Sequence, residues 1–155
     1  PPADNTLCFG ATFDVEDSSL ELSQAGQLQN QQELTAVLPN LLAELSSSSP
    51  LGGRVSFRCA SPDYLPLVGQ VPAIEAWQKN YQSTQSSLAI SDFPSEWNHA
   101  GLWLNIGHGS RGLASIPISA ELLASQLVGE PAPFEQALVN CLNPARFILK
   151  DLKRQ

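Results

Sequence analysis

The sequence predicts an α+β protein, with a mainly antiparallel sheet and flanking helices. Short stretches have the apolar runs or alternation of strands, and longer stretches carry apolar residues at helical spacing. The two kinds of stretch do not alternate regularly along the chain. Because a parallel sheet needs a crossover helix between successive strands, this irregular order favours antiparallel pairing. We expect two or three strands and three or four helices.

Three segments are predicted to form strands. Leu7 to Asp14 has an apolar bias and contains a glycine, which marks a close approach of the backbone. In Arg54 to Ala60, apolar and polar residues alternate, so its two arginines share one face of a sheet. Leu102 to Ile106 is an apolar run that leads directly into Gly107.

Four segments are predicted to form helices. The first spans Gln31 to Leu45, where Asn30 and Glu33 resemble a capping box and Pro39 predicts a kink. Gly129 is a good C-cap for one of the later helices. The later helices are expected at Ile74 to Tyr81, Ile118 to Val128 and Phe134 to Leu142.

Size and charge narrow the function classes. The chain has 155 residues, about one domain, and 43% of them are hydrophobic. Its net charge of −7 argues against a broad phosphate-neutralising surface, so most of any RNA-binding surface must lie elsewhere. No apolar run has the length of a membrane span, and Pro1 to Asp4 lacks the features of a signal peptide. The absence of methionine indicates a processed product or a piece of a longer protein.

The cysteines do not indicate a metal site. Cys8, Cys59 and Cys141 are widely spaced, and the chain has no C-x-x-C pair and only two histidines. We expect no bound metal, and three free, buried thiols in a reducing cytoplasm.

The segment Gly107 to Gly112 matches G-x-G-x-x-G after a predicted strand. In a dinucleotide fingerprint the loop opens a helix directly and a second strand follows, whereas here Ile116 and Pro117 precede the predicted helix. The dinucleotide interpretation therefore fails on its context. A nucleophile elbow, G-x-S-x-G, does not match because His108 occupies its first position, so a serine hydrolase is disfavoured.

What remains is a glycine-rich loop between a strand and a helix. Its amides can approach a planar or anionic ligand closely. The alternative is an ordinary tight turn, in which His108 is a hydrogen-bonded turn residue and Ser110 and Gly112 have no further role.

Two stretches together resemble the D-amino-acid-oxidase-like superfamily of FAD enzymes, Gly53 to Pro72 and Leu102 to Pro131. Three motifs are distinctive: R-C-A-x-x-D-x-L-P-x-V-G at Arg58 to Gly69, G-H-G-S-R-G-L at Gly107 to Leu113, and N-P-x-R-F at Asn143 to Phe147. The pattern is most similar to the C-terminal oxidoreductase region of bifunctional tRNA-modifying enzymes in that superfamily. The resemblance covers nearly the whole chain.

The resemblance implies oxidation of a secondary amine by FAD. The substrate would be 5-carboxymethylaminomethyl-2-thiouridine at a tRNA wobble position, in the cytoplasm. Hydride passes to the flavin, and hydrolysis of the imine releases a two-carbon aldehyde acid and leaves the aminomethyl form. A separate domain, which uses S-adenosylmethionine, then methylates that product.

The resemblance also assigns residue roles. A substrate carboxylate requires a bidentate arginine, for which Arg58 and Arg111 are candidates, although each can instead be a structural residue. Asp63 is a candidate base or a turn cap, so Arg58 and Asp63 are the catalytic candidates, and Tyr64 would line the substrate mouth. The helix behind the loop would stabilise the anionic reduced flavin. The cofactor-binding residues would be Gly107, His108, Gly109, Ser110, Arg111, Gly112 and Leu113.

By the same resemblance, residues 1–100 form most of a substrate-binding lobe and residues 101–155 form the C-terminal flavin-contacting strand, loop and helices. The sequence lacks the N-terminal FAD-binding βαβ unit and the methyltransferase domain. We therefore expect a fragment that is inactive alone and that exposes an apolar patch favouring self-association. The alternatives are a small amine or amino-acid oxidase of the same superfamily and a non-catalytic binding module.

Overall fold

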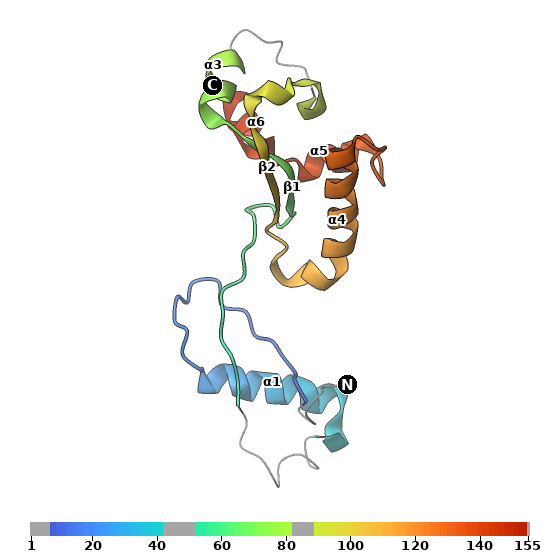
Figure 1. Ribbon diagram of the computed structural model, residues 1–155. Helices are drawn as coiled ribbons and strands as arrows, with labels where there is room; N and C mark the ends of the chain where they lie inside the picture. Colours follow the sequence, from blue (N-terminus) through green and yellow to red (C-terminus); the bar gives the residue numbers. More distant parts are fainter. Residues whose placement is uncertain (1–6, 42–51, 82–88, 155) are drawn as a thin grey trace. The chain divides into compact units, whose positions relative to one another are not determined.

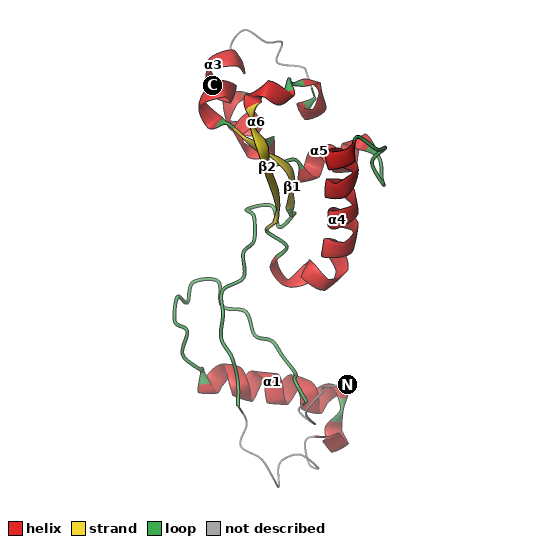
Figure 2. Cartoon of the chain, in the orientation of Figure 1, coloured by secondary structure: helices red, strands yellow, loops and turns green. Residues whose placement is uncertain are grey.

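The computed structural model describes residues 7–41, 52–81 and 89–154. The chain divides into two compact units, residues 1–57 and residues 58–155, and each is described by itself (Figure 1). Figure 2 shows the elements as helices and one pair of strands, and these strands run antiparallel. The predicted α+β class is confirmed.

The N-terminal unit contains helix α1, Gln24–Val37. It begins at Gln24 rather than at the predicted Gln31, because the Ser23 hydroxyl accepts a hydrogen bond from the Gly26 amide at 3.2 Å and caps the helix. The predicted kink at Pro39 is a break instead. Leu38 leaves the helical conformation before the proline, as the restricted residue before a proline tends to do. The predicted helix end at Leu45 lies outside the described residues.

Apolar side chains in the N-terminal unit are poorly covered. The predicted strand at Leu7 to Asp14 is wrong, since this segment is irregular and pairs with no strand among the described residues. A strand needs a neighbouring edge to receive its backbone hydrogen bonds, and an apolar bias does not supply one. None of the described residues of this unit is buried, and Phe13 and Val37 are 62% and 76% exposed.

The C-terminal unit is built on the pair β1, Leu67–Pro72, and β2, Asn98–Ile106. Leu67 lies opposite Ile106, so the C-terminal end of β2 meets the start of β1. The predicted strand at Leu102 to Ile106 is confirmed as part of β2, whereas β1 was not predicted.

The predicted strand at Arg54 to Ala60 is wrong. The segment is exposed and forms only an isolated bridge, between Ala60 and His108. Its alternating pattern was suited to a sheet face, but no ladder of the described residues includes it.

Four helices belong to the same unit as this sheet. The predicted helix at Ile74 to Tyr81 is confirmed, and Gly129 caps the next helix with a left-handed φ of 74°, as expected. One predicted helix starts at Gln136 rather than at Phe134, and the last helix was not predicted. The bounds are α3 Ile74–Tyr81, α4 Gly112–Val128, α5 Gln136–Leu142 and α6 Arg146–Leu152.

Two apolar clusters hold the C-terminal unit together. One joins α3 and α6, which Figure 1 shows near each other, and contains Trp77 with its ring centroid 5.0 Å from that of Phe93. The other joins β1, α4 and α5 through Val68, Leu122 and Val139. Helices α4 and α5 thus pack on the sheet through the second cluster, and this packing positions the loop that follows β2.

The cysteines differ from the expectation in one respect. Cys8, Cys59 and Cys141 are free, but all three are exposed rather than buried. Within the described residues, no helix combines the length and apolar character that a bilayer crossing requires.

Candidate functional site

The glycine-rich loop connects β2 to α4 by a sharp change of chain direction. Gly107 and Gly109 have φ values of 80° and 54°, in the left-handed region that favours glycine. The short 3-10 turn Gly109–Arg111 then leads into α4. Two of the three motif glycines are therefore required by the backbone itself.

Helix α4 starts at Gly112, which corrects the prediction that it starts at Ile118. Pro117 lies inside the helix, and it cannot make a backbone hydrogen bond to Leu113. The first turn is held in part by the Ser115 hydroxyl, which donates to the Arg111 carbonyl at 2.9 Å. The loop thus opens a helix directly, as in a dinucleotide fingerprint. The following parallel strand is still absent from the described residues, because β2 pairs antiparallel with β1.

His108 is occupied by local hydrogen bonds. Its Nδ1 lies 2.8 Å from the Ser115 hydroxyl, and its Nε2 lies 2.9 Å from Oδ1 of Asn105. Both ring nitrogens are therefore engaged by neighbouring side chains, and the tautomer decides which nitrogen donates. These bonds tie the loop to both β2 and α4, and they favour a hydrogen-bonded turn residue over a general base.

The start of α4 presents backbone amides that no side chain caps. No acidic residue lies in its first turn, and no side chain accepts a hydrogen bond at its N-cap. Ser110 and Arg111 are exposed and Leu113 is fully exposed. A Cβ at Gly112 would come within 3.3 Å of the Ile116 side chain. These features fit a planar anionic group seated against the loop and the positive end of the helix.

Asp63 is held by a bidentate ion pair with Arg146. The two N–H···O distances, from Nε to Oδ2 and from Nη2 to Oδ1, are both 2.8 Å. The Arg146 guanidinium holds the pKa of the Asp63 carboxyl far below its usual range, and hydrogen bonds from Ser61 and Leu65 lower it further. A carboxylate this acidic is a weak base, so the geometry favours the turn-capping alternative for Asp63.

Arg146 also binds the backbone of two loops. Its Nη2 donates to the Leu65 carbonyl at 2.8 Å, and its Nη1 donates to the Pro66 carbonyl at 3.2 Å. Nη1 further reaches the carbonyls that end α5. Arg146 therefore fixes the Asp-x-Leu-Pro turn to the start of α6. Sequence reasoning missed this role, although its signal was the arginine of the N-P-x-R-F motif.

The remaining motif positions join the same structure. Gly69 has a φ of 135°, and a Cβ there would lie 3.2 Å from the Pro144 ring, so the glycine permits a close approach. The Gly109 amide donates to the Cys59 carbonyl at 2.9 Å, and a bridge joins Ala60 to His108. The three motifs are thus brought together in the C-terminal unit.

The proposed substrate residues lie on open surface. Arg58 and Arg111 are exposed, and Arg58 lies three residues before the capped turn at Ser61. Tyr64 is 67% exposed and has a φ of 59°, which is unusual for a residue other than glycine. The turn that Asp63 and Arg146 hold therefore presents the Tyr64 side chain to solvent.

Residues 1–126 of the chain match the family of FAD-dependent oxidoreductases called DAO. The chain belongs to this family. The predicted superfamily is confirmed, and FAD is the cofactor that its name implies. No group of three His, Cys, Asp or Glu side chains in the described part of the chain is arranged to hold a metal ion.

The chain is also similar to proteins named tRNA 5-methylaminomethyl-2-thiouridine biosynthesis bifunctional protein MnmC. It is 40% identical to that of Marinomonas sp. over 99% of the chain, and 43% identical to that of Azoarcus sp. over 97%. The identity to the Pseudomonas aeruginosa protein is 39% over 99% of the chain. The chain spans 23%, 22% and 24% of these relatives, respectively.

Proposed function

We propose that this chain is the C-terminal oxidoreductase part of a longer, bifunctional tRNA-modifying protein. It would use FAD to remove the carboxymethyl group from 5-carboxymethylaminomethyl-2-thiouridine at the tRNA wobble position. The observation that carries the proposal is that the Arg58 to Gly69 motif contacts both other motifs, through the Gly109 amide and through the pair of Asp63 and Arg146. The family and the names of the similar proteins support the same activity.

Residues Gly107 to Leu113 are proposed to hold the flavin. The uncapped amides at the start of α4 are suited to donate to its pyrimidine edge, and the positive helix end favours a negative charge there. When bound, FAD supplies a two-electron acceptor for oxidation of a C–N bond. His108 would keep the loop in position through Ser115 and Asn105 rather than move a proton.

Arg58 and Arg111 are the proposed partners of the substrate carboxylate. Both guanidinium groups are exposed, and an arginine can bind a carboxylate through two parallel hydrogen bonds. Tyr64 would line the entrance for the modified base. Asp63 would act as a positioning residue, because its carboxylate is already bound to Arg146.

The remaining parts of the activity would lie in other domains. Residues 1–100 are proposed as most of a substrate-binding lobe and residues 101–155 as the flavin-contacting region. A βαβ unit would bind the rest of FAD, and a methyltransferase domain would use S-adenosylmethionine. We propose that the chain alone is inactive and self-associates, and that the whole protein acts in the cytoplasm.

The test compares the chain alone with the longer protein that contains it. Each is incubated with FAD and tRNA carrying the carboxymethylaminomethyl group, and the nucleosides are analysed by mass spectrometry. We expect conversion to the aminomethyl form with the longer protein only. Arg58→Met and Arg111→Met should raise the KM for tRNA or abolish turnover, whereas Arg54→Met, in the N-terminal unit, should do neither.

Other results would select the alternatives. Turnover of glycine or sarcosine by the longer protein without tRNA would favour a small amine oxidase. Failure of the longer protein to bind FAD would favour a binding module. A stoichiometric yellow complex of the chain alone, active on tRNA, would refute the proposal that the chain is an inactive fragment.

A further inference from the structure

The basic residues of this acidic chain are concentrated at one end. The chain has eight lysines and arginines and a net charge of −7, and four of the eight lie between residues 146 and 154. These four are on or directly after the short helix α6. With the acidic Asp151 in the same stretch, residues 146–154 have a net charge of +3, a local positive surface that the net charge of the chain conceals.

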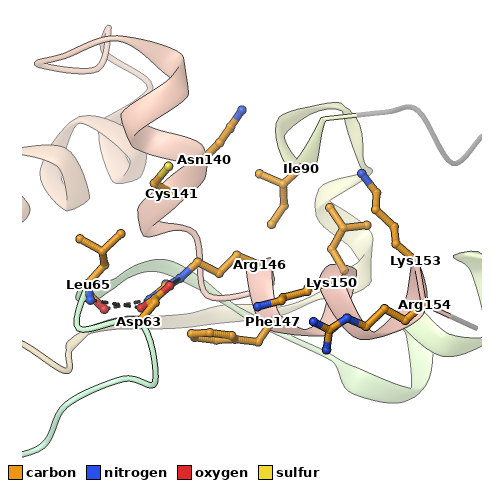
Figure 3. Close-up of a pocket in the computed structure, with 11 residues that line it drawn as sticks. Asp63, Leu65, Ile90, Asn140, Cys141, Arg146, Phe147, Lys150, Lys153 and Arg154 are labelled. Atoms are coloured by element: carbon orange, nitrogen blue, oxygen red, sulfur yellow. Dashed lines mark hydrogen bonds and ion pairs between the residues drawn. The ribbon is translucent and has the colours of Figure 1, made fainter.

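All four of these cations line one cavity of about 630 Å³. Figure 3 shows Lys150, Lys153 and Arg154 among the side chains that line the cavity, together with the apolar Ile90 and Phe147. The acidic side chain that lines the cavity, Asp63, is already bound to Arg146. The apolar lining is contributed by Leu65, Ile90, Phe147 and Leu149.

Helix stability accounts for only part of this arrangement. A cation in the last turn of a helix interacts favourably with the helix dipole, and Lys79 has the same place in α3 that Lys150 has in α6. Lys79 does not line the cavity. The dipole gives no reason for Lys150, Lys153 and Arg154 to border one apolar concavity.

We propose that this cavity and its basic edge bind a phosphate-bearing segment of tRNA, an inference that rests on the proposed function. RNA is bound through unstacked bases on apolar or aromatic surfaces and through cations at the phosphates. Lys150, Lys153 and Arg154 provide the cations, and the cavity provides an apolar wall of a size suited to a small ligand group. This surface would contact the tRNA in addition to the modified base.

A lipid membrane fits this surface less well. Binding in a membrane interface requires a helix that presents an apolar face to the bilayer. In α6, Leu149 is buried in the aromatic cluster, and Ile148 and Leu152 pack against it. Ile148, Leu149 and Leu152 of α6 are thus used by the core, whereas Phe147 and Lys150 line the cavity.

The test measures binding of fluorescently labelled tRNA to the 155-residue chain across a series of salt concentrations. Lys150→Gln is compared with Lys79→Gln, which removes the same charge from the same position in a helix. We expect Lys150→Gln to reduce the slope of log K against log salt by about 0.7, and the triple change with Lys153→Gln and Arg154→Gln to reduce it by about 2. Lys79→Gln should leave the slope unchanged.

Three outcomes would overturn the proposal: equal slopes for Lys150→Gln and Lys79→Gln, no tRNA binding by the wild-type chain, or binding to phosphatidylglycerol vesicles in preference to tRNA. The wobble-uridine assay on the longer protein separates this proposal from the proposed function. If Lys150→Gln leaves the KM for tRNA unchanged, the proposed tRNA-binding surface is contradicted and the proposed function is not affected. If the salt slope depends on Lys150 but the wild-type longer protein does not convert the nucleoside, the tRNA-binding surface is supported and the proposed function is contradicted.

Discussion

The two units of this chain have similar apolar residues but differ in what covers them. Leu28 in α1 is 54% exposed, whereas Leu122 in α4 is fully buried against the sheet. Both leucines lie on helices, so helix formation alone does not decide burial. The C-terminal unit has a strand pair and three further helices to pack against, and the described part of the N-terminal unit has no buried residue. Stability should therefore be concentrated in residues 58–155.

The sharpest test of this contrast uses the same substitution in each unit. Leu122→Ala should lower the free energy of unfolding by about 2–5 kcal/mol, because it leaves a cavity between α4 and β1. Leu28→Ala should change it by less than about 0.5 kcal/mol, since the side chain is already half in water. Urea titrations followed by circular dichroism measure both. Equal losses would contradict the contrast between the units.

A smaller loss is expected from the ion pair. Arg146→Met removes hydrogen bonds to Asp63 and to several carbonyls, and it should cost about 2 kcal/mol of unfolding free energy. Arg54→Met, in the N-terminal unit, is the control and should have little effect. If both variants retain wild-type stability, Arg146 does not hold the two loops together.

Glycine substitutions extend the comparison to the backbone. Gly69→Ala should cost about 1–2 kcal/mol, because its φ of 135° disfavours a side chain and the Pro144 ring would lie 3.2 Å from the new Cβ. Gly52→Ala should be nearly neutral, since nothing lies within 4 Å of its Cβ position. Thermal unfolding compares the two variants, and a destabilised Gly52→Ala would show that the N-terminal unit is more tightly packed than its exposure indicates.

The smallest effect depends on pH. The pKa of Asp63 is lowered in the folded protein, so its contribution to stability is present above the unfolded pKa and is lost as the pH falls. Below about pH 4, the wild type should lose up to about 1 kcal/mol relative to Asp63→Asn. Asp17→Asn, which changes a turn in the N-terminal unit, should keep the wild-type pH dependence. Parallel pH profiles for the wild type and Asp63→Asn would show that the pair contributes nothing.

The sequence predicted elements well where local pattern and tertiary partner agree. Ile74 to Tyr81 has a helical pattern and packs on α6, and Leu102 to Ile106 pairs with a strand. Arg54 to Ala60 alternates as a strand should, yet no ladder forms on it in the described chain. Leu67–Pro72 was missed because it contains a glycine and ends in a proline, and its strand form depends on β2.

The motifs singled out segments that the fold brings together, but the contacts between these segments were not predicted. The loop from Gly107 was singled out from its glycines, and their φ values explain two of them. The pair of Asp63 and Arg146 joins residues 83 positions apart, and no local pattern predicts a contact at that separation. The start of α4 was misplaced because Pro117 was taken as a helix boundary, while the bonds of Ser115 support the turn before it.

Pro117 also determines how α4 responds when the chain opens locally. The carbonyl of Leu113 receives no hydrogen bond from the residue four positions later, so the backbone ladder is interrupted near the helix start. The first turn is joined instead to β2, through His108 and Asn105. Its amide hydrogens should therefore exchange with solvent at the rate of those at the strand end rather than at the rate of those in the rest of α4. The first turn of α4 can thus change shape while the remainder of the helix stays packed on the sheet.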